Sequence, residues 1–412
     1  MKLFLILPQN LIAHPYFWGY MTSIIPGGRL AELKSPKILM EISIIVNVGA
    51  LALSPIAAHI HTWLLVAVRL LQGIADSVAL PAMHMIISKW APPNERHVIA
   101  SIVYAGAGFI IATSVMLTEL IYVWLGTPDD SPAASHYLFC FQATLCFIWS
   151  ILWYKWITDS PTEQTKYISE EEREYIVTSL KEHMGNFFKR VPWWQIFCSS
   201  PFMAIVIAHI CSYFSYIMVH NTLHSLLPCI SKHNTISATE LLIFSIPCIG
   251  TWVFAIILSR VLATWQEKDV ITVTRSRKIS ILFASLVPTL GLLLLTIRTG
   301  NRSDYTGKFM LMTIMMICMG GIFSGCYANH IDIAPKLAGS LLAITNFVAL
   351  GVVVILFQLL AFVARSTRNK VKRFPKSQFR RRTREPNYFQ VTNTHLLRHL
   401  FFTLLITLIK SV

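Results

Sequence analysis

The chain has 412 residues, of which 54% are hydrophobic and only 13% carry a formal charge, and its formal net charge is +15. A soluble domain carries roughly 25% charged residues, so this sequence has too few polar side chains to cover a compact soluble fold. Its mean hydropathy of +0.57 agrees. The 18 Gly, 19 Pro and low charge density also exclude collagen-like and disordered classes. The composition predicts a membrane protein.

Ten apolar segments are long enough to cross a bilayer, because a helix needs about 20 mostly apolar residues to span the hydrocarbon core. The first segment is the weakest, since Pro8, Gln9, Asn10 and Pro15 interrupt it. The sequence therefore predicts an all-α membrane protein with about ten spanning helices. The ten segments are 3–28, 38–58, 63–88, 98–125, 137–158, 200–227, 238–259, 279–297, 309–328 and 338–363.

Lys and Arg in the connecting loops orient these helices, because basic loops stay on the cytoplasmic side. Loops on one side hold 16 Lys and Arg, against 4 on the other. The basic, predicted cytoplasmic loops are 29–37, 88–97, 159–199, 259–278 and 329–336. The sequon Asn301-Arg302-Ser303 falls on the opposite side, which makes Asn301 a candidate glycosylation site.

A long polar segment divides the predicted helices into five and five. Within it, Ser169 followed by Glu170, Glu171 and Glu172 is typical of a helix start, with a capping serine and an acidic first turn. We therefore expect a cytoplasmic surface helix here, with a loop as the alternative. The predicted units are an N-terminal bundle at 1–158, this central loop at 159–199, a C-terminal bundle at 200–363 and a basic tail at 364–412.

The tail contains a dense basic run, with ten Lys and Arg between 365 and 385. Such a run favours the cytoplasmic face and anionic lipid headgroups. Because few aromatic residues accompany the charges, lipid contact fits better than nucleic-acid binding, and we expect no nucleic-acid partner. Ten crossings would place this segment outside, so either a crossing is missing at each end of the chain or the tail does not belong to the architecture.

Two opposite charges lie within the predicted helix 63–88. Arg69 and Asp76 are seven residues apart, so they share one helix face with Gln72 and Gly73 between them. Charged residues inside a membrane are rare and usually face a bundle interior or a water-filled path. Arginine suits carboxylate or phosphate groups, and a carboxyl group in low dielectric can exchange protons near neutral pH. The pair predicts an anion site with an ion-coupling group; the alternative is an Arg–Asp pair that only fixes helix packing.

Enzymatic and metal chemistry are not indicated. The sequence contains no C-x-x-C pair, no phosphate-binding glycine loop and no nucleophile elbow, so we expect neither an enzyme nor a metal site or resident cofactor. The eight cysteines lie mostly in apolar runs and are interpreted as small buried hydrophobic residues.

Several ordered motifs resemble the anion:cation symporter family of the major facilitator superfamily, which includes sialin, the vesicular glutamate transporters and the sodium/phosphate cotransporters. The motifs are Phe17-Trp18-Gly19-Tyr20, residues 25–32, Arg69-Leu70-Leu71-Gln72-Gly73, residues 88–96 and Asn329-His330-Ile331-Asp332-Ile333-Ala334-Pro335. The resemblance covers roughly residues 14–350. It implies two six-helix bundles around a central site that opens alternately to each side, with the family's first and last helices absent from this chain.

The resemblance also implies roles for individual residues. Arg69 falls where the family binds its anionic substrate, Tyr20 at a site-lining tyrosine, and Asp76 at a glutamate linked to proton coupling. His84 matches a family histidine and is included among the substrate-binding candidates. Gly28 and Glu32 fall in the gating loop after the family's second helix.

These observations predict a secondary transporter of an organic or inorganic anion, coupled to protons or sodium, in the plasma membrane or a lysosomal or vesicular membrane. By the same resemblance, Ser212 occupies the position of a second substrate-binding arginine of the glutamate transporters, which argues against glutamate as substrate. We expect a monomer. The alternative hypothesis is a truncated, non-transporting fragment or regulatory derivative of such a transporter.

Overall fold

The computed structural model describes residues 15–125, 132–183, 191–230, 238–297 and 305–372. In this part of the chain the regular elements are all helical, as the sequence predicts. Within the described residues, nine helices are long and apolar enough to cross a membrane. The chain is thus a multi-pass membrane protein.

The N-terminal helices are α2 (Pro15–Leu33), α3 (Pro36–Ile60), α4 (Thr62–Trp90), α5 (Arg96–Leu125) and α6 (Pro132–Trp156). They match the first five predicted segments. The weakest of these, α2, is not among the nine apolar spans and contains Pro26, Arg29 and Glu32. It nevertheless packs along α4 and so belongs to the bundle.

The C-terminal helices are α9 (Ser200–Ile230), α10 (Ala238–Glu267), α11 (Val273–Ile297), α12 (Tyr305–Cys318) and α14 (Ala338–Lys372). After α12 the chain continues through a π-helical turn, η3 (Phe323–Tyr327), α13 (Ala328–Ile333) and η4 (Pro335–Leu337). A π turn re-aims the side chains that follow it. The helix α14 runs nine residues past the predicted boundary at 363.

The central segment forms the expected surface helix. It holds η1 (Pro161–Glu163), α7 (Glu170–His183) and α8 (Trp193–Phe197). The Ser169 hydroxyl accepts a hydrogen bond of 3.2 Å from the Glu172 N–H, which confirms the predicted cap. The helix packs through Ile176 and Leu180, which are both buried.

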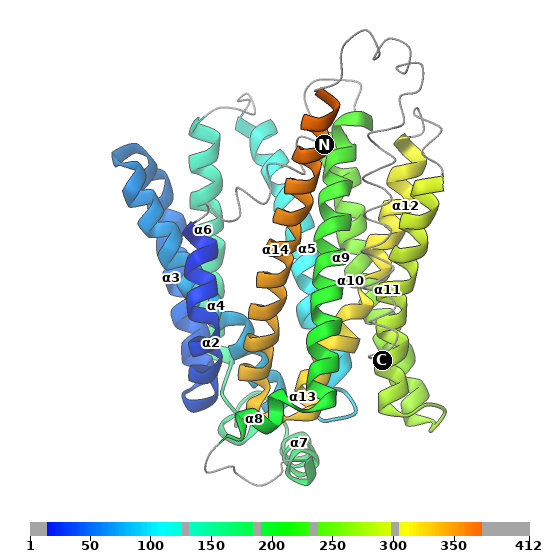
Figure 1. Cartoon of the computed structure of the whole chain (residues 1–412). Helices are drawn as coiled ribbons and strands as arrows, with labels where there is room; N and C mark the ends of the chain where they lie inside the picture. Colours follow the sequence, from blue (N-terminus) through cyan, green and yellow to red (C-terminus); the bar gives the residue numbers. More distant parts are fainter. Residues whose placement is uncertain (1–14, 126–131, 184–190, 231–237, 298–304, 373–412) are drawn as a thin grey trace.

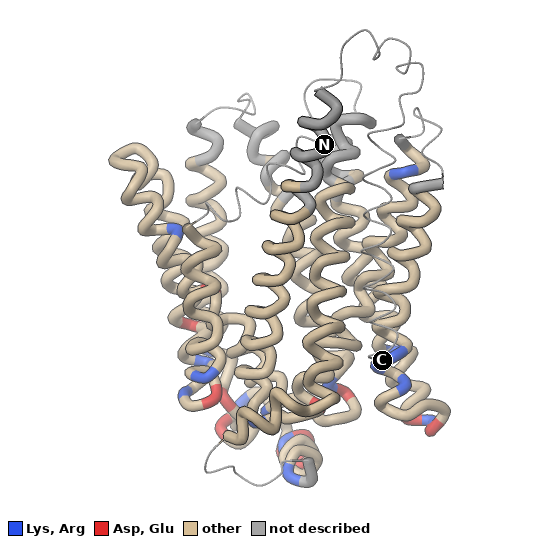
Figure 2. Tube along the Cα trace, in the orientation of Figure 1, with Lys and Arg blue, Asp and Glu red and all other residues tan. Residues whose placement is uncertain are grey.

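The N-terminal and C-terminal helices stand as two groups that meet at one end of the molecule, where α7, α8 and α13 lie (Figure 1). We call this the α7 end. The two groups contact each other mainly through α2 on α14 and α5 on α10. Charged residues gather at the α7 end and are sparse along the middle of the helices (Figure 2).

Candidate functional site

Two glycines set the distance between α2 and α4. A Cβ atom on Gly73 would lie 2.0 Å from the Tyr16 carbonyl oxygen, and one on Gly19 would lie 2.2 Å from the Leu70 carbonyl oxygen. Only glycine permits this backbone approach. The approach brings Tyr16 and Tyr20 of α2 beside the polar face of α4.

Asp76 on α4 is held by two neutral hydrogen-bond donors. The Tyr16 hydroxyl donates a hydrogen bond of 3.0 Å to one carboxylate oxygen, and the Asn47 amide of α3 donates to the other. Asp76 is half-buried, and among the described residues no basic side chain forms an ion pair with it. A carboxyl group without a fixed counter-charge can be neutralised by a bound cation or proton, which fits a coupling role.

Arg69 lies on the same helix, about 10 Å along the axis at 1.5 Å per residue. Its Nη1 donates a hydrogen bond of 2.8 Å to the Gln72 Oε1, and its guanidinium lies 5.6 Å from the centroid of the Phe139 ring on α6. No carboxylate of the described residues lies within ion-pair distance of it. The packing pair of Arg69 with Asp76, considered as an alternative, is therefore not formed.

Tyr20 connects this face of α4 with the other bundle. Its hydroxyl accepts a hydrogen bond of 2.9 Å from the Asn346 amide of α14. Its ring stacks on that of Tyr16, with centroids 6.3 Å apart, and Tyr16 in turn contacts Asp76. Sequence analysis identified Tyr20 and Asp76 but missed Tyr16, Asn47 and Asn346, whose polarity within apolar helices was the available signal.

His84 lies away from Arg69, about 22 Å further along α4. It is fully buried between the bundles, where Nδ1 contacts the Tyr104 hydroxyl of α5 and Nε2 lies 3.1 Å from the Tyr327 carbonyl oxygen of η3. Its ring is 5.8 Å from that of His330. The structure thus places His84 in an interface cluster, and substrate binding by His84 stays a prediction.

Glu32 and Gly28 lie in the last turns of α2, so the predicted gating loop is helical at both positions. The buried Glu32 carboxylate accepts hydrogen bonds from the Ser340 backbone N–H of α14, at 2.7 Å, and from Arg29, at 2.6 Å. A Cβ on Gly28 would lie 2.5 Å from the Ala343 Cβ of α14. Both residues therefore lie where the two bundles contact each other at the α7 end, and their gating role stays a prediction.

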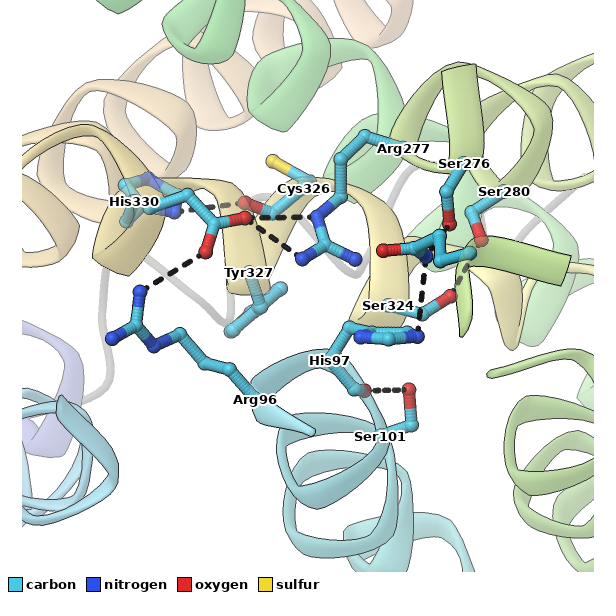
Figure 3. Close-up of polar contacts among 12 residues, drawn as sticks. Arg96, His97, Ser101, Ser276, Arg277, Ser280, Ser324, Cys326, Tyr327 and His330 are labelled. Atoms are coloured by element: carbon cyan, nitrogen blue, oxygen red, sulfur yellow. Dashed lines mark hydrogen bonds and ion pairs between the residues drawn. The ribbon is translucent and has the colours of Figure 1, made fainter. Parts of the chain in front are cut away.

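An ion cluster that sequence analysis missed joins the bundles at the same end (Figure 3). Asp332 of α13 pairs with Arg96 of α5 through an Nη1–Oδ1 contact of 3.2 Å. Its other oxygen accepts two hydrogen bonds from Arg277 of α11, at 2.9 and 2.8 Å. Both guanidiniums are almost fully buried. The signals in the sequence were Asp332 and Arg96, which each lie within a matched motif.

Asn301 lies outside the described residues. Within the described ranges, no group of three or more His, Cys, Asp and Glu side chains could hold a metal ion.

With this geometry in place, comparison with known proteins decides the family. The family model described as "Major Facilitator Superfamily" matches residues 9–358. The chain belongs to the Major Facilitator Superfamily.

The superfamily is one of transporters rather than enzymes, and the relatives of this chain are those that the sequence motifs indicated. Human sialin is 33% identical over 348 residues, covering 82% of this chain and 65% of sialin. A Drosophila ananassae protein, named as an inorganic phosphate cotransporter, is 30% identical over 82% of this chain and 68% of its own length. Vesicular glutamate transporter 3 of Danio rerio is 29% identical over 82% of this chain and 55% of its own length. The chain thus spans 65% of sialin's length.

Solved superfamily structures share the fold. The proton:xylose symporter XylE, bound to 6-bromo-6-deoxy-D-glucose, superposes with a TM-score of 0.56 at 17% identity, covering 82% of this chain and 78% of XylE. The two-bundle arrangement of this chain is therefore that of the superfamily.

Proposed function

We propose that this chain is a secondary active transporter of a small organic or inorganic anion, coupled to protons or sodium by alternating access. In this proposal Arg69 binds the anion and Asp76 takes part in ion coupling. The observation that carries it is the absence of a carboxylate partner for Arg69 among the described residues, on a membrane-spanning helix. A membrane-embedded cation without a counter-ion is costly unless an anion or water solvates it.

The surroundings of Asp76 support the second half of the proposal. Asp76 is held by neutral donors from α2 and α3, so its charge state can change without breaking an ion pair. The contact chain from Asp76 through Tyr16 and Tyr20 ends at Asn346 on the other bundle. A change of charge at Asp76 can thus alter a contact between the bundles, which alternating access requires.

The names of the relatives support an anionic substrate, since they include an inorganic phosphate cotransporter and a vesicular glutamate transporter. We place the α7 end in the cytoplasm, because the basic loops lie there, and the protein in the plasma membrane or a lysosomal or vesicular membrane. We propose that it works as a monomer.

The test is driven uptake in proteoliposomes that contain the full chain. An inward proton gradient or an inward sodium gradient is imposed separately, and the accumulation of radiolabelled phosphate or glutamate is measured. We expect one gradient to drive phosphate above its equilibrium level, with glutamate taken up less because Ser212 offers no second cation. Equal, passive accumulation of a broad anion panel with either gradient would contradict the proposal.

A further inference from the structure

A cavity of mixed polar and apolar lining lies at the α7 end, within the C-terminal helices and apart from Arg69. It has a volume of about 230 Å³, is partly open, and is bordered by α9, α11 and α13. The α9 side is apolar, whereas α11 and α13 contribute most of its polar lining. Its polar lining residues are Thr274, Arg277, Lys278, Asn329 and Asp332.

Positive charge is in excess around this cavity. Arg277 donates through Nε and Nη2 to one oxygen of Asp332, at 2.9 and 2.8 Å, while Arg96 occupies the other oxygen at 3.2 Å. The Asp332 carboxylate therefore pairs with two guanidiniums. Lys278 adds a third positive charge at the cavity wall. Of these charged residues, Arg277, Lys278 and Asp332 line the cavity and Arg96 does not, so the lining carries a net charge of +1.

The buried guanidiniums also have unused hydrogen-bond donors. The side chain of Arg277 is only 5% exposed, yet its Nη1 has no hydrogen-bond partner among the described residues. Nε and Nη2 of the buried Arg96 also lack partners among the described residues, although Arg96 does not line the cavity. Buried charged donors without partners cost free energy, and an added anion that accepts from them offsets that cost.

The start of α11 points to the same ligand. The first residues of this 25-residue helix, Val273 and Thr274, line the cavity. A helix N-terminus presents free N–H groups and the positive end of the helix dipole, which together favour an anion. The dipole, the excess of cations and the cavity are independent features that converge on one place.

We propose that this cavity is a second anion site, which binds a phosphate group through the Lys278 and Arg277 side chains and the backbone N–H groups of Val273 and Thr274 at the start of α11. A phosphate monoester carries a charge of about −1.5 to −2, opposite in sign to the net positive lining of the cavity. Arginine and lysine are the side chains that bind phosphate most often. Both free inorganic phosphate and the headgroup of phosphatidic acid offer this chemistry, and the site stands whether or not Arg69 binds a transported anion.

The test measures equilibrium binding of radiolabelled inorganic phosphate to the purified full chain. The Arg69→Gln variant is used as background, so that binding at the central site does not contribute. In this background we compare Lys278→Gln with Arg275→Gln, which removes a positive charge from an exposed position on the same helix, outside the cavity lining. We expect Lys278→Gln to weaken phosphate binding about tenfold, as loss of a charge-assisted contact does, and Arg275→Gln to change it less than twofold.

A parallel arm uses nanodiscs of phosphatidylcholine with or without phosphatidic acid. If phosphatidic acid displaces inorganic phosphate from the Arg275→Gln chain but not from the Lys278→Gln chain, the bound phosphate group is that of the lipid headgroup. If only inorganic phosphate binds, the source is the free anion. Equal phosphate and lipid binding by Lys278→Gln and Arg275→Gln, or no binding of either by both chains, would overturn the second site. Neither of these results would bear on uptake through Arg69.

Discussion

The Asn346 amide of α14 donates a hydrogen bond of 2.9 Å to the Tyr20 hydroxyl of α2, and so joins the two bundles one aromatic ring away from the Tyr16–Asp76 contact. Coupling in a transporter requires a structural element that can adopt two arrangements. The ion site and the substrate site must both shift the equilibrium between those arrangements. The α2–α14 contact is suited to this role. Tyr20 stacks on Tyr16, whose hydroxyl binds the Asp76 carboxylate, and Asn346 belongs to the other bundle.

Replacing Asp76 with asparagine should remove the pH dependence of transport. Asparagine keeps a similar shape and remains neutral at every pH, so uptake by this variant should no longer rise with an inward proton gradient. The measurement is the initial uptake rate at a series of external pH values, with Asp76→Glu as the control that keeps a titratable group. A pH profile unchanged in Asp76→Asn would exclude the coupling role.

The Tyr20→Phe substitution should weaken the contact between the bundles. It leaves the Asn346 amide without its acceptor, and loss of such a hydrogen bond lowers stability by about 1 kcal/mol. Thermal unfolding in detergent measures this loss. Tyr154→Phe is the matched control, since Tyr154 is 70% exposed. Equal effects of the two substitutions would show that the contact with Asn346 contributes nothing.

A methyl group at Gly28 should prevent the bundles from closing at the α7 end. The new Cβ would lie 2.5 Å from the Ala343 Cβ and 2.8 Å from the Gly339 carbonyl oxygen, so the helices must separate. Such overpacking costs about 1–3 kcal/mol, and we expect the uptake rate of Gly28→Ala to fall about tenfold or more. Gly49→Ala is the control, because nothing lies within 4 Å of the added Cβ. Similar rates for the two variants would argue against a gate at Gly28.

Removing the charge of Asp332 should destabilise the protein strongly. The Asp332→Asn variant leaves Arg96 and Arg277 buried without a carboxylate, and breaking a buried ion pair in this way costs about 3–5 kcal/mol. Glu170→Gln removes one partner of the surface pair with Arg173 and should cost at most about 1 kcal/mol. Chemical denaturation of both variants checks the difference, and a small loss for Asp332→Asn would mean that the cluster does not stabilise the fold.

The fold was predictable from the sequence because membrane helices are specified by local composition. The apolar runs located the spanning helices, and Ser169 with the acidic residues after it located the start of α7. The prediction was less accurate where helices end: Glu32 belongs to α2 rather than to a loop, because its turn is held by contacts with α14. Those contacts come from residues about 300 positions away.

The candidate site was predictable only in part, for the same reason. Arg69 and Asp76 stand out as charges within an apolar helix. The residues that contact them do not stand out in the sequence. Tyr16 and Asn47 contact Asp76 and Phe139 contacts Arg69, each from a different helix. The interface position of His84 likewise depends on how the two bundles pack, which a linear pattern does not contain.

Anion binding by Arg69 is the central claim, and uptake by the Arg69→Ala variant tests it most directly. The control is Arg260→Ala, which removes an exposed arginine on α10. Both variants are reconstituted at equal surface density, and radiolabelled anion uptake is measured under the gradient that drives the unmodified chain. We predict that Arg69→Ala abolishes uptake while Arg260→Ala keeps at least half of it. Uptake retained by Arg69→Ala would contradict the account.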